Sequence, residues 1–493
     1  MNLYGGTIGT AAGYGAANHG GIISVRGTLN MYGGSVVGGK STLYGGTISV
    51  TTASGIFNLY GGTVSGGTAP MGGNVYVETG KVNISGGSAD HVFATKGSTL
   101  SISGGETQKV TVSGITLKLS GVPVIGELIP ETDASGNKSV ITAAAALAEG
   151  TSITVTDLLP DGVFSDNTLG SYAKYFHSKD PNRGVYGIDN PIYGEEVGKL
   201  YLGKYHCLCG KEPHVGSCDG KAIKWTALTD TASLKTGGSF YLTGDVSSAQ
   251  ISLGKGIVTN LDLNGHAYIA SVSNAFLVNG DASTRLVLCD SAGGGTLQGR
   301  GFATANQGGA VYIRAGNMDI YGGTICKAKN YQVTNHGGLI SVRGTLHMYD
   351  GTIEGGTSQE YGGNVSVSAS GIFYLHGGTI TGGSAPKGGN ICVTSSAKLY
   401  IQGGKVENGI ASESGGNVYV DKQNTVVFEI TGGELLGGTA TVSGGNLFVL
   451  DAVGTKSVTG GKVTGGTAPT GSCVYVAAGT LTVGPDAVIE KLN

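Results

Sequence analysis

Short apolar runs alternate with pairs of glycine along the whole chain. Within the runs the hydrophobic positions lie two residues apart, as where Val75 and Val77 flank Tyr76. A period of two predicts β-strands whose successive side chains point to opposite faces. The residue before the glycine pair, which is Asp-Gly after Tyr349, recurs at intervals of 27 or 28 residues in two columns, Tyr4, Tyr32, Tyr60 and Tyr321, Tyr349, His376. A fixed repeat of this length indicates a solenoid.

Composition selects among the repeat architectures. The 493 residues include 93 glycines and 10 prolines. Glycine inside a helix costs about 1 kcal/mol relative to alanine, which excludes helical repeats, and the glycines do not recur every third residue as in collagen. A leucine-rich repeat is the alternative, but its leucine spacing is missing. We therefore predict an all-β fold, a right-handed parallel β-helix with one coil of three short strands per repeat.

A second column holds asparagines that follow glycine pairs. Its members are Asn74 in the first half of the chain and, spaced by 26, 27 and 29 residues in the second half, Asn364, Asn390, Asn417 and Asn446. With one coil per repeat, these amides would lie above one another about 4.8 Å apart. They are then expected to bond along the axis as a ladder, interrupted at Thr47 and Cys473, which occupy the same column.

The repeats form two tandem modules with a small β-rich cap between them. The expected divisions are a first module, its closing coils and cap, a Cys/His knuckle, and a second module with its own N-terminal cap: 1–125, 126–205, 206–223 and 224–493. Residues 224–238 are expected to form a short capping helix around Trp225.

The two modules align closely. Residues 18–29 match 335–346 at 11 of 12 positions, which places Met1 opposite Met318. We expect a fragment of a longer tandem protein, truncated at both ends, whose open coils associate end to end.

Cysteine and histidine cluster once, in Cys207, Cys209, His214 and Cys218. Thiolates and imidazole are the usual ligands of structural zinc, although a Cys-x-Cys spacing is tighter than the common one. One structural zinc, a Cys209–Cys218 disulfide and reduced thiols all remain open. The total of seven cysteines is odd, so a complete disulfide framework is excluded. No other cofactor is expected.

Two surface columns are candidates for ligand binding. Arg314 and Arg343 occupy the same place in consecutive coils, so their guanidinium groups should lie one coil apart on one face. Two positive charges at that distance repel each other unless they are solvated or share an anion. Tyr321, Tyr349 and His376 each follow an inward apolar residue and should face outward as an aromatic ladder. Such a ladder could stack on sugar rings or could fix the register of the coils.

The run LDLNGH at residues 261–266 resembles the first coils of right-handed β-helices of the pectin-lyase-like kind. The glycine-pair repeats with their GGN corners are similar to bacterial surface or adhesin-like repeat proteins. The resemblance covers about residues 1–125 and 240–493. It implies an extracellular or cell-surface adhesin or stalk, with glycans or other cell surfaces as partners. Asp262 within the run is expected to support a turn.

A carbohydrate-active enzyme of the same fold, a polysaccharide lyase or glycoside hydrolase, is the alternative function. Glycoside hydrolysis needs two carboxyl groups about 5 to 9.5 Å apart. Acids inside the repeats occur singly, for example at Glu78, Asp350, Glu354, Glu407, Asp421 and Glu434, so we expect no catalysis. A net charge of −3 without a basic run argues against nucleic acid. No apolar run reaches the roughly 18 residues that suggest a membrane span.

Overall fold

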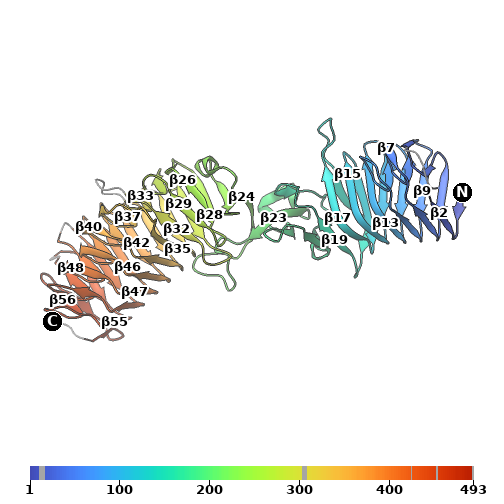
Figure 1. The fold of residues 1–493 in the computed structure, drawn as a ribbon. Helices are drawn as coiled ribbons and strands as arrows, with labels where there is room; N and C mark the ends of the chain where they lie inside the picture. Colours follow the sequence, from blue (N-terminus) through green and yellow to red (C-terminus); the bar gives the residue numbers. More distant parts are fainter. Residues whose placement is uncertain (10–16, 302–307, 423–424, 451–452, 491–493) are drawn as a thin grey trace. The chain divides into compact units, whose positions relative to one another are not determined.

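The strands of the chain stack into parallel β-solenoids (Figure 1). The computed structural model describes residues 1–9, 17–301, 308–422, 425–450 and 453–490. They form two compact units, residues 1–205 (unit 1) and 206–493 (unit 2). The predicted all-β parallel solenoid is confirmed, while its right-handed sense stays a prediction.

A coil in the middle of unit 2 contains four short strands. Residues 345–367 form β38 (Thr345–Met348), β39 (Thr352–Glu354), β40 (Ser358–Tyr361) and β41 (Val365–Val367). The next coil repeats this path, since Thr345 pairs with Ile372 and Val365 pairs with Ile391. The predicted three strands per coil are therefore too few here. The additional strand β40 forms because its residues find parallel partners in the coils on both sides.

Four parallel sheets of unit 2 result, called sheets 1 to 3 and the short sheet. Sheet 1 consists of β24 (Ile223–Ala227), β25 (Gly238–Tyr241), β28 (Val258–Asp262), β31 (Arg285–Cys289), β34 (Asn317–Ile320), β38, β42 (Ile372–Leu375), β46 (Lys398–Ile401), β50 (Val427–Ile430), β54 (Lys456–Val458) and β57 (Thr482–Val483). Sheet 2 consists of β26 (Val246–Ser248), β29 (Ala267–Ala270), β32 (Thr296–Gly299), β35 (Thr324–Lys327), β39, β43 (Thr379–Thr381), β47 (Lys405–Glu407), β51 (Glu434–Leu436), β55 (Lys462–Thr464) and β58 (Val488–Ile489). Sheet 3 consists of β27 (Ile251–Leu253), β30 (Phe276–Asn279), β33 (Val311–Ala315), β37 (Ile340–Val342), β41, β45 (Ile391–Val393), β49 (Val418–Val420), β53 (Leu447–Val449) and β56 (Val474–Val476). The short sheet consists of β36 (Thr334–His336), β40, β44 (Ser384–Lys387), β48 (Ile410–Ser414) and β52 (Thr439–Ala440).

Unit 1 is built in the same way and ends in a small antiparallel group. Its parallel strands are β1 (Asn2–Leu3), β2 (Thr7–Gly9), β3 (Ala17–His19), β4 (Ile23–Ser24), β5 (Thr28–Met31), β6 (Ser35–Val37), β7 (Ser41–Tyr44), β8 (Ile48–Val50), β9 (Ile56–Leu59), β10 (Thr63–Ser65), β11 (Val75–Val77), β12 (Lys81–Ile84), β13 (Ser88–Thr95), β14 (Thr99–Ile102), β15 (Glu106–Ser113), β16 (Thr116–Gly121), β17 (Val124–Glu131), β18 (Val140–Leu147), β19 (Ser152–Val155) and β21 (Phe176–Ser178). The antiparallel strands are β20 (Gly162–Val163), β22 (Gly184–Gly187) and β23 (Leu200–His206). Two 3₁₀ helices, η1 (Gly170–Tyr175) and η2 (Pro191–Glu196), lie between them.

The hydrophobic core runs along the inside of each coil. In β42, Phe373 and Leu375 are fully buried, whereas Ile372 and Tyr374 are partly exposed. The parallel register places Phe373 on Leu346 of the preceding coil. The alternation that predicted strands therefore also sorts the side chains into core and surface. Each coil buries its apolar face only against its neighbours, so stability comes from the stack.

The predicted asparagine ladder is present in unit 2. Side-chain Nδ2 atoms donate to the next Oδ1 along the axis, at 2.8 Å from Asn364 to Asn390, 2.7 Å from Asn390 to Asn417 and 2.7 Å from Asn417 to Asn446. All four side chains are buried. Each Oδ1 also accepts a glycine N–H of its own coil. The ladder therefore ties neighbouring coils together and holds a glycine corner in each.

Asn74 is not part of an amide ladder, contrary to the prediction. It is buried, but its Nδ2 atom has no hydrogen-bond partner. Its backbone bonds lead to Thr47 and His91, whose side chains carry no amide. A different column of unit 1 forms the ladder instead, with 2.8 Å bonds between the amides of Asn2, Asn30, Asn58 and Asn83.

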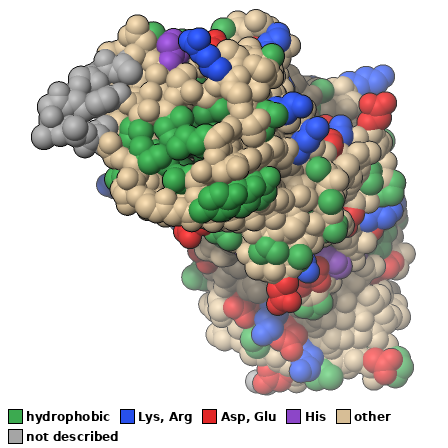
Figure 2. Space-filling model, turned by 90° about the vertical axis from the view of Figure 1, so that its right-hand side faces the viewer, with side chains coloured by type: hydrophobic (Ala, Val, Ile, Leu, Met, Phe, Trp, Pro, Cys, Tyr) green, Lys and Arg blue, Asp and Glu red, His purple; other side chains and the backbone are tan. Residues whose placement is uncertain are grey.

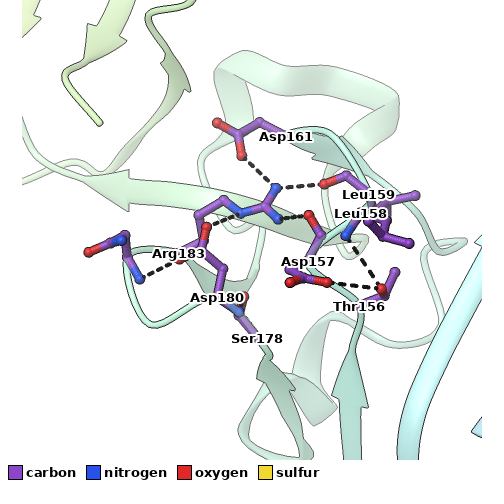
Figure 3. A network of polar contacts seen from close by, with 9 residues as sticks. Thr156, Asp157, Leu158, Leu159, Asp161, Ser178, Asp180 and Arg183 are labelled. Carbon is purple, nitrogen blue, oxygen red and sulfur yellow. Dashed lines mark hydrogen bonds and ion pairs between the residues drawn. The ribbon is translucent and has the colours of Figure 1, made fainter. Parts of the chain in front are cut away.

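A largely buried arginine holds the closing segment of unit 1 together (Figure 3). The Arg183 guanidinium donates to the carbonyl oxygens of Leu159 at 2.6 Å and Asp157 at 2.8 Å. It also binds the carboxylates of Asp161 at 3.3 Å and Asp180 at 3.1 Å. One side chain thus joins the loop after β19 to the turn after β21.

The start of unit 2 differs from its prediction. Trp225 lies in strand β24 rather than in a helix. The helical part is the 3₁₀ helix η3 (Thr231–Lys235), which begins after Asp230, whose Oδ1 accepts the Ala232 N–H at 2.9 Å. The period-two alternation of β24, which pairs with β25, outweighs helix formation around the tryptophan. Among the described residues, no helix is both long enough and apolar enough to cross a membrane.

Candidate metal centre and surface columns

The four Cys/His side chains of the predicted knuckle meet at one point. The ligand atoms of Cys207, Cys209, His214 and Cys218 all lie within 4.8 Å of one another. Cys207 Sγ is 3.4 Å from Cys209 Sγ and 3.3 Å from His214 Nδ1, and Cys209 Sγ is 3.8 Å from the same nitrogen. In the described part of the chain, this is the one group of three or more His, Cys, Asp or Glu side chains that could hold a metal ion.

Two tight turns bring these donors together. The N–H of Gly210 donates to the carbonyl of Cys207 at 3.0 Å, and Gly210 has a φ of 65°. This turn brings the sulfurs of Cys207 and Cys209 to the same nitrogen of His214. A second turn, in which the Cys218 N–H donates to the Val215 carbonyl at 3.3 Å, returns the last sulfur to the group.

The surroundings of Cys207 and Cys209 shift the pKa values of these two neighbouring thiols in opposite directions. Burial raises the pKa of Cys207, and hydrogen bonds to Cys209 and Cys218 raise it further. Burial opposes ionisation of Cys209 as well, but backbone hydrogen bonds at Val215 and Lys211 and the bond to His214 lower the pKa of Cys209 overall. The pKa of His214 is raised, chiefly by its bond to Cys209. Of these two thiols, Cys209 is therefore the one that loses its proton more readily.

The spacing of Cys207, Cys209 and His214 suits a tetrahedral metal ion. Bonds of about 2.3 Å to sulfur and about 2.0 Å to nitrogen place neighbouring donors roughly 3.5–3.8 Å apart in a tetrahedron, close to the distances found here. All seven cysteines are free thiols. The alternative Cys209–Cys218 disulfide is thus not formed in the structure.

The knuckle packs on the outer face of sheet 1. Cys207, Cys209 and Trp225 share a buried cluster with Cys289 and Tyr321. Ser217 Oγ lies 2.9 Å from the hydroxyl of Tyr321 and donates to the hydroxyl of Tyr349 at 3.1 Å, and Lys211 forms an ion pair with Asp350. Tyr321 is consequently only 2% exposed. The prediction that Tyr321 faces solvent is wrong, because the knuckle covers it.

Known proteins provide no family assignment. No protein-family model, no curated protein and no solved structure matches this chain. Functional proposals for the molecule therefore depend on its own residues.

The aromatic ladder itself is present. Ring centroids are 4.9 Å apart for Tyr321 and Tyr349, and 4.6 Å apart for Tyr349 and His376, with interplanar angles of 12° and 6°. A second column, which the repeat pattern did not predict, runs beside it through His347, Tyr374 and Tyr400, with ring centroids 4.8 and 4.9 Å apart. Stacking at these distances covers each ring face with the next ring. A ring that has a neighbour on both sides, such as Tyr349 or Tyr374, therefore exposes only its edge and its polar atom to solvent. Its faces are not available to a sugar.

The two arginines lie as predicted in consecutive coils and are both exposed. The Arg343 guanidinium lies over the ring of Tyr312 at 5.6 Å. Arg343 also lines a groove of about 170 Å³, which the repeat pattern did not predict, together with His336, Tyr361, Ser368, Thr394 and Asp421. Arg314 is not among the residues that line this groove.

Asp262 supports a turn, as expected. Its Oδ1 atom accepts the N–H groups of Asn264 and Ser291, both at 2.9 Å. Its Oδ2 atom lies 3.1 Å from His206 Nε2, and the His206 ring stacks on Trp225. These bonds hold the pKa of the buried Asp262 carboxyl below its usual value, although burial alone would raise it. Asp262 thus contacts His206, the residue that directly precedes Cys207 of the knuckle.

Charges of both signs lie on the face of the molecule drawn in Figure 2. Figure 2 views the molecule from the side of its N-terminus and shows Lys and Arg interspersed with Asp and Glu, beside patches of hydrophobic side chains. The exposed hydrophobic residues of unit 1 include the stacked column Tyr4, Tyr32 and Tyr60, with centroids 5.0 and 4.9 Å apart.

Proposed function

We propose that the chain is a non-enzymatic repeat protein of the cell surface or the extracellular space that acts as a stalk. The observation that carries this proposal is the use of side chains for contacts between coils. Amides of the Asn364 to Asn446 column bond along the axis, and the aromatic columns stack along the same direction. The run at residues 261–266 and the GGN corners resemble those of pectin-lyase-like β-helices and bacterial surface repeats, and this resemblance supports the extracellular setting.

The distribution of acids supports a non-enzymatic role. Among the described residues, the only cluster of three or more potential metal ligands is the Cys/His knuckle, so no group of aspartates resembles a calcium-bridged lyase site. Asp350, which follows Tyr349 of the aromatic ladder, is engaged by Lys211. We expect no new reducing or unsaturated ends when the protein is incubated with a panel of polysaccharides. Release of such ends would favour the enzyme alternative.

The stalk proposal can be tested by measuring the force at which the protein unfolds. Pulling on both ends of the protein by single-molecule force spectroscopy should unfold unit 2 in small steps, because each coil bonds mainly to its neighbours. Asn417→Ala should lower the force of these steps, since it removes two ladder bonds. Unfolding at the same force in both proteins would contradict the role of the ladder, and unfolding at forces near those of an unstructured chain would contradict the stalk.

An adhesin that binds glycans is the second candidate, and the groove at Arg343 favours it. The groove combines a guanidinium group, the hydroxyls of Ser368 and Thr394, and the carboxylate of Asp421, all groups that bond to sugar hydroxyls. A glycan array should then show binding that Arg343→Ala abolishes. Arg314→Ala is the matched control, because Arg314 is exposed but lies outside the groove. If the folded protein bound no glycan on the array, the adhesin would be contradicted and the stalk would be the remaining proposal.

We further propose that the knuckle holds one structural zinc ion. Three sulfurs and one imidazole form a common donor set for structural zinc, and the knuckle lies over sheet 1 without a large core of its own. Cys207, Cys209, His214 and Cys218 would be the ligands. Bound zinc would add stability to the segment 206–223, because a metal site that forms only in the folded state stabilises that state.

The fluorescence of Trp225 can be used to monitor this site, since it is the single tryptophan and lies in the same buried cluster as Cys207 and Cys209. The purified protein should contain one zinc per chain by elemental analysis. EDTA should lower the melting temperature and shift the Trp225 emission to longer wavelength, and Cys218→Ser should do the same. Cys326→Ser is the control, because Cys326 is a free thiol outside the knuckle. A fully folded, metal-free protein that EDTA leaves unchanged would contradict the zinc site.

A further inference from the structure

A pocket of about 240 Å³ lies beside sheet 2 in the first coils of unit 2. Its polar lining consists of Ser247, Ser271, Arg300, Lys329 and Asn330. Ser271 follows the last residue of β29, Arg300 follows β32, and the segment with Lys329 begins just after β35. These three strands are successive partners in the sheet. Residues far apart in the sequence therefore lie on consecutive coils around one cavity.

Arg300 has unused binding capacity in this pocket. One of its terminal nitrogens donates to the carbonyl of Ser271, whereas its Nε atom is buried and has no hydrogen-bond partner. In the described part of the chain, no carboxylate forms an ion pair with Arg300. A buried N–H without an acceptor is uncommon in folded proteins and calls for an explanation. A ligand atom that accepts this hydrogen bond provides one.

The rest of the pocket is cationic or neutral. Lys329 is exposed and, among the described residues, forms no ion pair, and no acidic residue lines the cavity. Hydroxyl groups of Ser247 and Ser271 and the amide of Asn330 add neutral donors. The groove at Arg343 differs, because Asp421 contributes a negative charge there. The pocket at Arg300 therefore favours a ligand that only accepts hydrogen bonds and carries negative charge.

We propose that this pocket binds the tetrahedral oxyanion of a phosphate or sulfate monoester. A guanidinium group and an ammonium group form the charge-assisted hydrogen bonds that such oxygens prefer. The wall formed by Ile269, Ala270 and Ala328 is apolar, which lowers the local dielectric constant and strengthens these bonds. The cavity is somewhat smaller than the roughly 300–1,000 Å³ of pockets for drug-sized ligands. It suits the charged head of a small ester, with the remainder of the molecule in solvent.

The oxyanion pocket is independent of the stalk and of zinc. It uses neither the ladder columns nor the knuckle, so the protein would keep both if the pocket were empty. The charged group could come from a phosphorylated or a sulfated saccharide, and both supply the same tetrahedral oxyanion.

Isothermal titration calorimetry of the full chain tests the proposal with glucose 6-phosphate, glucose 6-sulfate and unmodified glucose at low ionic strength. At least one ester should bind, and glucose should not. Binding of only the phosphate or only the sulfate would identify the source. Inorganic phosphate or sulfate should compete with the corresponding ester, because the oxyanion is the recognised group. Absence of binding by both esters, or equal binding of glucose, would overturn the proposal.

Substitutions in and outside the pocket test whether the ester binds there. Arg300→Gln and Lys329→Gln should each weaken binding of the ester at least tenfold, and Arg314→Gln, an exposed arginine on sheet 3, should leave it unchanged. Circular dichroism and the melting temperature check that Arg300→Gln folds. Lys329 is exposed, so Lys329→Gln gives a clear result even if Arg300→Gln is unstable. Affinity that is unchanged in Lys329→Gln, or lost equally in Arg314→Gln, would place the ester elsewhere and refute the pocket.

Discussion

A single buried asparagine makes four hydrogen bonds in the ladder of unit 2. Asn390 Oδ1 accepts from Asn364 Nδ2 and Gly383 N, and its Nδ2 donates to Glu407 O and Asn417 Oδ1. Asn390→Ala leaves these buried groups without their partner, and an unsatisfied buried group costs about 1–3 kcal/mol. We expect the free energy of unfolding of unit 2 to fall by about 2–4 kcal/mol, measured by urea denaturation followed by circular dichroism.

Asn74→Ala is the matched control for the ladder. Asn74 is equally buried, but its Nδ2 atom has no partner to lose. The substitution should therefore shift the unfolding midpoint of unit 1 much less. Similar losses in both variants would mean that burial of the amide, rather than its bonds along the axis, determines the stability.

The second aromatic column should make stability depend on pH. Burial, the nearby His376 and the charge of Arg285 lower the pKa of His347 to about 4. The unfolded chain therefore takes up a proton at His347 near pH 6.5, before the folded chain does. Proton uptake by the unfolded state favours unfolding, so the stability that His347 contributes is full above pH 6.5 and is lost as pH falls towards 4.

His347→Tyr isolates this effect, since a tyrosine can stack on Tyr374 but does not titrate in this range. Melting temperatures measured from pH 7.5 to 4.5 should fall less steeply for the variant than for the natural protein. Parallel curves would show that other groups, rather than His347, cause the acid sensitivity.

The residue columns show where sequence spacing is sufficient and where it is not. Nearly regular spacing placed the column from Asn364 to Asn446 correctly, because each member has at least one amide neighbour at the same corner. It failed for Asn74, since the chain beside it presents Thr47 and His91. It also overestimated the exposure of Tyr321, because the segment that covers this ring lies about 100 residues earlier in the sequence.

Individual elements were predicted less completely than the stack as a whole. The strands that alternate strictly, such as β42, followed from the pattern. The strand β40 was missed because its sequence, SQEY, is polar and forms a strand only through parallel partners in the neighbouring coils. The pocket at Arg300 was missed for a similar reason. Its polar residues come from several consecutive coils, and their convergence depends on where each strand ends.

The closing segment of unit 1 depends on Arg183. Arg183→Gln would remove the guanidinium from Asp161 and Asp180 and from two carbonyl groups. Removal of one partner from a buried ionic network costs about 3–5 kcal/mol. We expect a clear fall in the melting temperature of unit 1, measured by differential scanning calorimetry, whereas Arg26→Gln at an exposed site should have little effect. An equal effect of both substitutions would show that the network adds nothing beyond surface charge.

At the scale of the molecule, the regular register of unit 2 means that a whole coil can be removed. Strand β42 pairs with β46, with Ile372 opposite Lys398. Deletion of residues 372–397 would join Gly371 to Lys398 and would offer Lys398 N the Gly344 carbonyl that Ile372 N now binds at 2.8 Å. The inward residues Leu399 and Ile401 would replace Phe373 and Leu375 on the preceding coil.

We expect this deletion to leave unit 2 folded, because a solenoid loses only one neighbour interface when one repeat is removed. Circular dichroism should keep its strand signal, and the melting temperature should fall by a few degrees at most. Deletion of residues 372–384 is the control, since removal of half a coil brings the wrong strands opposite one another and should unfold the region. If the full-coil deletion unfolded unit 2 as completely as the half-coil deletion, its coils would be coupled over longer distances than the pairing of neighbours implies.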